Sequence, residues 1–124
     1  MAVLGGRLAI ARCGPGEPLP DWLPASAPFT SVTRTAGELS IVCAEAAVPP
    51  GVRSQGGYRA LAVEGPIPLD VVGLLARLAR ALADAEVSIF PIATFDTDYI
   101  LVPEVALPRA LAALRQGGIL IIDD

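Results

Sequence analysis

Residues 88–104 place the strongest constraint on the fold, because they read as two apolar strands that meet at a polar corner. The strands cover residues 88–94 and 98–102, and Phe95, Asp96, Thr97 and Asp98 join them. Pro91 has no N–H to donate, so the first strand should lie at a sheet edge or contain a bulge. Two acids and two threonines are more polarity than a turn requires, and a small ligand could use the corner.

The segments around this strand pair complete a recognisable order of elements. Residues 58–64 read as a strand, and Pro68 and Asp70 are suited to open a helix after it. Residues 107–116 form a second expected helix that Gly117 ends, and residues 119–122 form a final strand. The first helix has an apolar face with a 3.6-residue period, made by Val71, Leu74, Leu75, Leu78 and Leu82. The order predicts an α+β unit of the ferredoxin-like type (βαββαβ), an antiparallel sheet with helices on one face.

The first half of the chain repeats the pattern of the second half in a shortened form. Strands are expected at residues 6–12, 29–34 and 39–44, but the prolines of residues 15–28 leave room for one helical turn at most. Trp22 is expected to plug a core or an interface. We therefore predict an abbreviated unit over residues 1–52, a polar linker at 53–57 and a complete unit over 58–124. The abbreviated unit cannot cover its own sheet and should pack on the other unit or on another copy.

Composition excludes several classes of function. The 124 residues are 53 % hydrophobic and 18 % charged with a net charge of −4, which predicts a dense core. All nine basic residues are arginines and they are scattered, so the chain has no patch for nucleic acid. No apolar run approaches the roughly 20 residues of a membrane helix, and no export signal is visible. We expect a cytoplasmic protein in which Cys13 and Cys43 are buried, reduced thiols.

Catalysis has little support in the sequence. There is no histidine, which removes the commonest general base and the commonest metal ligand. Asp96 and Asp98 form the one close pair of acids at the corner, and nothing supplies a third catalytic group beside them. No glycine-rich phosphate loop is present either. We expect no enzymatic activity, no cofactor and no metal.

Several strings resemble the tandem ACT-domain proteins, which are related to the ACT regulatory domains of aspartate kinases and to the cytosolic arginine sensors of the TOR pathway. The specific string is Thr-Phe-Asp-Thr-Asp-Tyr-Ile-Leu-Val at residues 94–102. Supporting strings stand at residues 31–35, 38–43, 73–75 and 88–90. The resemblance spans residues 8–122 and implies two ferredoxin-like ACT units, the first abbreviated.

The resemblance implies non-catalytic binding of a small ligand, usually an amino acid, at an interface between ACT units. A helix N-terminus offers N–H groups to a carboxylate, and Asp98 could accept a hydrogen bond from an ammonium. We expect a homodimer with ligand sites between copies. The matching positions are Gly73 and Leu74 in the helix turn, Thr94, Phe95, Thr97 and Asp98 at the corner, and Ser88 and Ile89 from the neighbouring unit.

One departure from the family pattern bears on the ligand. In the arginine sensors an acidic residue two positions before the glycine meets the arginine side chain, and here that position is Val71. A smaller or more apolar amino acid therefore fits better than arginine. Two alternatives stay open, a structural interaction module that has lost ligand binding and, less favoured, a small metal-free enzyme.

Overall fold

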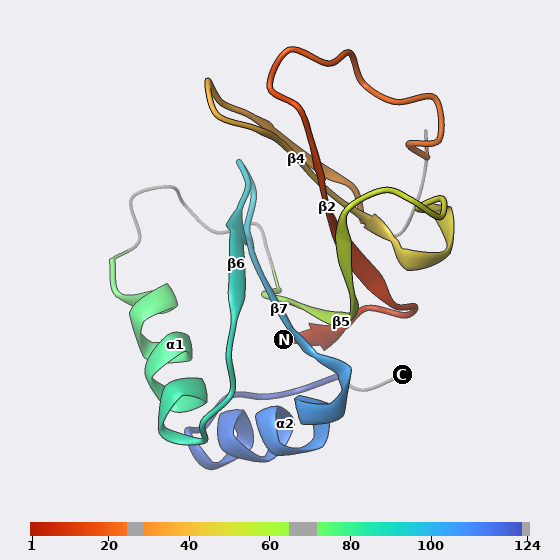
Figure 1. The fold of residues 1–124 in the computed structure, drawn as a ribbon. Coiled ribbons are helices and arrows are strands. Elements are labelled where there is room, and N and C mark those ends of the chain that lie inside the picture. Colours follow the sequence, from red (N-terminus) through yellow and green to blue (C-terminus); the bar gives the residue numbers. More distant parts are fainter. Residues whose placement is uncertain (25–28, 65–71, 123–124) are drawn as a thin grey trace. The chain divides into compact units, whose positions relative to one another are not determined.

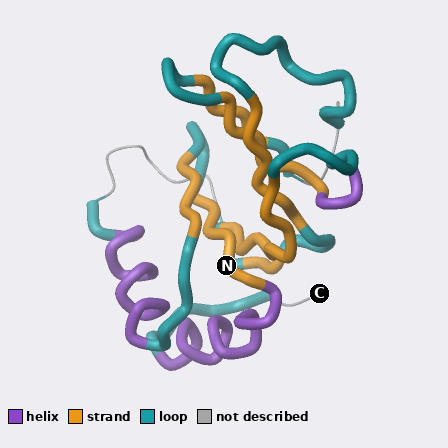
Figure 2. The backbone as a smooth tube through the Cα atoms, in the orientation of Figure 1, coloured by secondary structure: helices purple, strands orange, loops and turns teal. Residues whose placement is uncertain are grey.

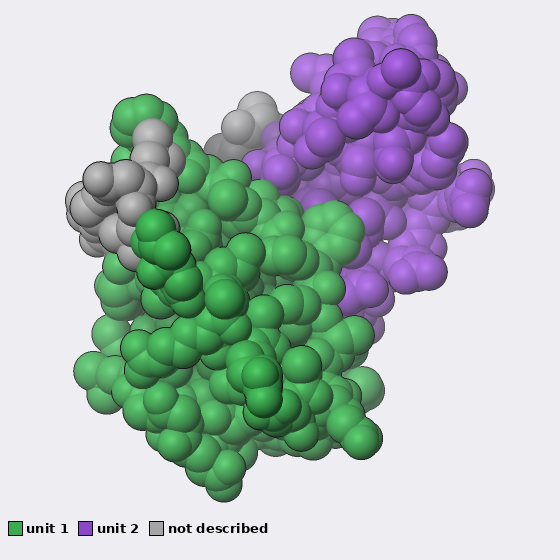
Figure 3. Space-filling view, turned by 90° about the vertical axis from the view of Figure 1, so that its left-hand side faces the viewer, with its two compact units in different colours: residues 1–5, 59–124 green, residues 6–58 purple. Residues whose placement is uncertain are grey.

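The computed structural model describes residues 1–24, 29–64 and 72–122. The chain divides into two compact units, shown in different colours in Figure 3. The N-terminal unit holds residues 6–58, and the C-terminal unit holds residues 1–5 together with 59–124. The first five residues thus belong to the C-terminal unit, although the sequence placed them in the first. Residues 54–57, expected as a linker, are the beginning of a long strand, β5 (Ser54–Ala62).

The C-terminal unit is an antiparallel sheet with two helices. Its strands are β1 (Ala2–Val3), the later part of β5, β7 (Asp98–Pro103) and β6 (Phe90–Ala93). The helices are α1 (Leu74–Asp84) and α2 (Leu107–Gln116), and a 3₁₀ turn, η2 (Glu104–Ala106), precedes α2 (Figure 1). Both helices bury leucines against the same sheet face. This core contains Leu61, Leu78, Leu82, Ile100, Val102, Ala110, Leu111 and Leu114.

The prediction of a strand at residues 119–122 is wrong, because this segment does not pair as a strand of the sheet. Among the described residues, Ile122 forms an isolated parallel bridge to Ala2. The position beside β5 belongs instead to β1, which pairs antiparallel with Ala2 opposite Ala62 and Val3 opposite Leu61. Such pairing links the two ends of the chain, and local sequence pattern does not reveal it.

Pro91 lies where its missing N–H predicted. The strand order of the sheet ends with β6, which pairs with β7 from Phe90 opposite Leu101 to Ala93 opposite Asp98. Pro91 is exposed on this edge strand. The prediction of an edge is therefore confirmed, although the strand is shorter than expected at both ends.

The two helices agree unequally with the sequence pattern. The second begins and ends as predicted, with Pro108 in its first turn. The first begins later, at Leu74, because Gly73 has a φ of +89° and stands before the helix rather than inside its first turn. Pro68, Asp70 and Val71, which entered the helix prediction, lie outside the described residues.

The N-terminal unit is a sheet with strand order β3-β4-β2-β5. The strands β2 (Leu8–Cys13), β3 (Ser31–Arg34) and β4 (Leu39–Ala44) pair antiparallel, and the β3–β4 hairpin confirms the predicted one. Among its described residues, the helical segment is the 3₁₀ turn η1 (Glu45–Ala47) (Figure 2). Apolar side chains from irregular segments cover one sheet face instead of a helix. Trp22, Leu23, Val48 and Val52 pack there on Ala11, Leu39, Ile41 and Cys43.

The carboxylate of Glu45 holds together the irregular pairing of β2 and β5. It accepts a hydrogen bond from the Gly57 N–H at 2.7 Å and pairs with Arg7 at 3.3 Å. A Cβ atom on Gly56 would stand 2.0 Å from Oε1 of Glu45. A side chain at position 56 would therefore displace the Glu45 carboxylate from its present position.

Gly56→Ala is expected to lower the free energy of unfolding by about 1–2 kcal/mol, because the displaced carboxylate loses its bond to Gly57. Urea denaturation measures the change. Gly16→Ala is the matched control, since nothing lies within 4 Å of a Cβ at that position. Equal stability of the two variants would contradict the proposed role of Glu45.

Glu86 ends α1 in a conformation that suits glycine better. Its φ is 59°, and the N–H groups of Glu86 and Val87 donate to the carbonyls of Ala83 and Leu82, both at 2.9 Å. Arg109 donates to the carbonyls of Ala85 and Glu86 at 2.9 and 3.2 Å and fixes this end of the helix to α2. The helix therefore closes with a left-handed residue, as glycine-ended helices do.

Glu86→Gly is expected to raise the free energy of unfolding by about 0.5–1 kcal/mol, because glycine adopts a positive φ without the steric cost of a Cβ. Thermal or urea unfolding checks this gain. Glu86→Ala removes the same carboxylate but keeps the Cβ, so it should give no gain. A stabilisation of equal size in both variants would assign the effect to charge instead.

Candidate functional site

The predicted corner between β6 and β7 is a tight, internally bonded turn. The Thr94 N–H and hydroxyl both donate to the Thr97 carbonyl, at 2.8 and 3.0 Å. The Thr97 N–H donates back to Oγ1 of Thr94 at 3.3 Å. Both threonines therefore stabilise the turn. Phe95 projects from it, with 79 % of its surface exposed.

The same corner is tied to the end of β5. The Thr97 hydroxyl donates to the Val63 carbonyl at 2.8 Å, and the Val63 N–H donates to the Asp98 carbonyl at 3.0 Å. Asp98 thus begins β7 with its backbone bonded to Val63, and its side chain is half-buried. Of the predicted corner residues, Thr97 and Asp98 are the ones that the structure joins to a neighbouring element.

Gly73 and Leu74 stand where the chain enters α1. No side chain of the described residues caps this helix start, and the Arg77 N–H donates to the Gly73 carbonyl at 3.0 Å. Apart from its two chain neighbours, no atom of the described residues lies within 4 Å of the position of a Cβ on Gly73. The positive φ of Gly73, and not close packing by a described residue, therefore explains why glycine stands at this position.

Ser88 and Ile89 precede β6 and differ in burial. Ser88 is exposed, whereas Ile89 is half-buried and packs on the core of the C-terminal unit. Their expected contribution to the site of a neighbouring copy stays a prediction. Ile89 has a core contact whether or not such a neighbour exists.

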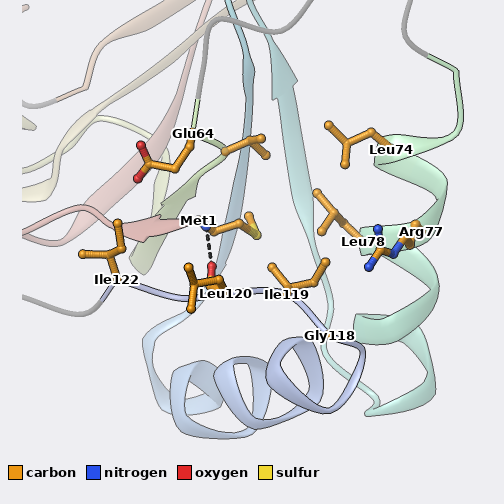
Figure 4. A pocket seen from close by; sticks show the side chains of 10 residues that line it. Met1, Glu64, Leu74, Arg77, Leu78, Gly118, Ile119, Leu120 and Ile122 are labelled. Carbon is orange, nitrogen blue, oxygen red and sulfur yellow. Dashed lines mark hydrogen bonds between the residues drawn. The ribbon is translucent and has the colours of Figure 1, made fainter.

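A pocket of about 330 Å³ opens in the C-terminal unit beside the first two turns of α1. Leu74, Arg77 and Leu78 line it from the helix, and Val63 and Glu64 line it from the end of β5 (Figure 4). The segment after α2 and the first residue complete the lining. These residues are Gly118, Ile119, Leu120, Ile122 and Met1, and the Met1 ammonium donates to the Leu120 carbonyl at 2.6 Å.

The predicted residues coincide with this pocket only in part. Leu74 lines the pocket directly. Thr97 does not line it, but its hydroxyl donates a hydrogen bond to Val63, which does. The sequence did not single out Arg77 or Glu64. Arg77 and Arg80 fall outside the apolar face of this helix, but the three-residue spacing from Leu74 to Arg77 makes these two side chains neighbours on the helix surface.

The pocket has one cationic side chain and one carboxylate. The Arg77 guanidinium donates to the Gly117 carbonyl at 3.3 Å, which uses one of its five N–H donors. Figure 4 shows Glu64 across the pocket from Arg77, with its carboxylate turned away from the guanidinium. The two charges therefore do not form an ion pair with each other.

The described residues offer little support for a metal site, a reactive thiol or a membrane-spanning helix. Within residues 1–24, 29–64 and 72–122, no three His, Cys, Asp or Glu side chains gather as a metal site would require. Burial raises the pKa of the Cys43 thiol, which makes it a weaker nucleophile at neutral pH. None of the described helices has the length and apolar character that a membrane crossing requires.

Two protein-family models match parts of this chain. The model of the ACT domain matches residues 53–116, and a second family model, of an N-terminal domain, matches residues 6–51. No protein in the curated set matched the chain.

Solved structures share this fold. A structural-genomics target from Agobacterium tumefaciens is 32 % identical, with 99 % of this chain and 91 % of that chain covered and a TM-score of 0.92. A Vibrio cholerae protein of unknown function, described as a possible transport protein, is 23 % identical, with 93 % and 86 % covered and a TM-score of 0.74. The regulatory subunit of aspartate kinase from Thermus thermophilus is 13 % identical, with 90 % and 93 % covered and a TM-score of 0.64. The chain therefore belongs to the ACT-domain family.

Proposed function

We propose that this protein is a non-catalytic regulatory module of the cytoplasm that binds an amino acid between ACT units. The observation that carries the proposal is the pocket beside the start of α1, because its lining includes Leu74 of the predicted ligand set. Its volume of about 330 Å³ lies within the range of small-molecule sites. ACT domains are in general regulatory, ligand-binding modules.

The surroundings of the pocket support a ligand with a carboxylate. No side chain of the described residues caps α1, and the start of a helix carries a partial positive charge. Arg77 adds a full positive charge one turn further along the same helix. An amino acid carries the negative group that both would attract.

A second copy of the chain would complete the site in this proposal. Phe95 at the corner and Ser88 before β6 are both exposed, so a neighbouring copy can reach them. A two-fold dimer would form two equivalent sites. Ligand binding would then favour the assembled form, provided that the ligand binds this form more tightly.

A thermal-shift screen with the twenty amino acids tests the function. A ligand present at 100 times its Kd should stabilise the protein by about 2.7 kcal/mol, which a shift in Tm reports. Light scattering with and without the best amino acid then measures the oligomeric state. A Tm unmoved by every amino acid would contradict sensing and favour the structural interaction module, and a strict monomer in both states would exclude the dimeric site.

A further inference from the structure

We propose that the pocket beside α1 binds the aliphatic side chain of an amino acid, with Arg77 holding its carboxylate. This assignment rests on the proposed function and adds to it the chemical class of the ligand and the side chain that anchors it. Neither follows from membership of the ACT family.

The walls of the pocket determine what its interior accepts. Leu74 and Leu78 of α1 face the pocket across from Met1 in Figure 4. Val63, Ile119, Leu120 and Ile122 add further apolar surface. The described lining residues include no aromatic or hydroxyl side chain, so few of them would hydrogen-bond a polar side chain of the ligand. A branched aliphatic group of four or five carbons would bury itself without leaving polar atoms unsatisfied.

Arg77 is suited to hold the carboxylate for geometric reasons. Its bond to the Gly117 carbonyl orients the guanidinium at the pocket, while further N–H donors remain for a ligand. Gly118 has a φ of +84°, and a Cβ there would make ordinary van der Waals contact with Nη2 of Arg77 at 3.8 Å, so the glycine is explained by its conformation. A guanidinium binds a carboxylate through two parallel hydrogen bonds, which fixes the ligand's orientation.

Arg80 provides a matched comparison on the same helix. It lies outside this pocket, and its Nε is 3.3 Å from both carboxylate oxygens of Asp84. Its charge is therefore neutralised locally, whereas the described partner of the Arg77 side chain is a carbonyl. The Met1 ammonium is a second cation in the lining, and it donates to the Leu120 carbonyl. Among the pocket's side chains, Arg77 is left as the cation for a ligand.

Glu64 is the group that would attract the ligand's ammonium. It is exposed at the opposite side of the pocket, and its carboxylate is turned outward in Figure 4. It would need a rotation of its side chain to reach the ligand. We therefore assign it a smaller contribution than that of Arg77.

Calorimetric titration with three probes separates the parts of this assignment. The probes are L-leucine, 4-methylpentanoate, which lacks the ammonium, and isopentylamine, which lacks the carboxylate. Leucine should bind most tightly, 4-methylpentanoate more weakly and isopentylamine not measurably. Arg77→Met keeps the aliphatic stem and should weaken leucine by about 10- to 100-fold, because a charge-assisted bond is lost. Arg80→Met should leave the affinity within about twofold.

The outcomes distinguish this assignment from the function on which it rests. Equal affinity for leucine in Arg77→Met and wild type, or binding of isopentylamine as tight as that of 4-methylpentanoate, would overturn it. Binding of other amino acids alone, with no dependence on Arg77, would also overturn it but leave the proposed function standing. If 4-methylpentanoate bound through Arg77 and no amino acid bound, the pocket chemistry would hold and the amino-acid function would fail. Absence of binding by all three probes at about 10 mM would overturn the assignment, and the thermal-shift screen with the twenty amino acids then decides the proposed function separately.

Discussion

Leu82→Ala is expected to lower the free energy of unfolding by about 3 kcal/mol, the loss typical of a leucine removed from a packed core. Leu82 is 0 % exposed and lies in the core between α1, α2 and the sheet of the C-terminal unit. The β7 side of this core cannot collapse to fill the space, because strand pairing fixes Ile100 opposite Pro91. Urea denaturation followed by circular dichroism measures the change.

The control for this substitution is Leu75→Ala on the same helix. Leu75 is 37 % exposed, so the same change of side chain should cost less than about 1 kcal/mol. Comparable losses in the two variants would mean that α1 does not present Leu82 to the core. That result would contradict the orientation of the helix and with it the placement of Arg77 at the pocket.

Ile41→Ala is expected to destabilise the N-terminal unit by a similar amount, about 2–4 kcal/mol. Ile41 is 0 % exposed at the centre of the cluster that Trp22 and Val48 cover. No helix covers this face among the described residues, so the unit depends on these few side chains. Tryptophan fluorescence during urea unfolding is the natural measurement, because Trp22 packs on the same cluster.

Val32→Ala is the matched control for Ile41→Ala. Val32 pairs directly opposite Ile41 in the β3–β4 hairpin but is 39 % exposed. Its truncation should cost less than about 1 kcal/mol. Directly paired residues of an antiparallel sheet point to the same face, so the two positions differ in how well that face is covered. A loss at Val32 as large as that at Ile41 would contradict the covering of Ile41 by Trp22 and Val48.

Local sequence signals were sufficient to predict the elements that begin or end at a proline or a glycine. Pro108 and Gly117 flank α2, and the predicted range agrees with the observed one. Pro91 marked an edge strand because its missing N–H affects hydrogen bonding wherever the strand lies. The hairpin of residues 31–44 followed from β-forming runs on either side of a short glycine-containing turn.

Features that depend on distant pairing were not predictable in this way. Residues 119–122 have the apolar character of a strand, yet β1 holds the position beside β5. Nothing in residues 1–5 indicates that they pair with Leu61 and Ala62, because pairing over such a separation depends on the assembled sheet. For the same reason, the sequence assigned residues 1–5 to the N-terminal unit, whereas they belong to the C-terminal unit.

The candidate site was predictable where one element supplies it and not where several meet. Leu74 entered the predicted site through the resemblance to ACT proteins, and it lines the pocket, although the helix was expected to begin earlier in the chain. Arg77 has the spacing of a surface residue, and it faces a pocket only because the segment after α2 returns beside α1. Contacts of Gly73, Phe95, Ser88 and Ile89 with a ligand stay predictions.

An amide-resolved NMR titration of the wild-type protein with L-leucine tests the central claim most directly. Saturable shifts should concentrate at Val63, Leu74, Arg77 and Ile119, the residues that line the pocket beside α1. The cluster around Ile41 and Trp22 in the N-terminal unit should change little. Unchanged amide positions around the pocket at about 10 mM leucine, or shifts confined to the N-terminal unit, would contradict an aliphatic amino-acid site in the C-terminal ACT unit.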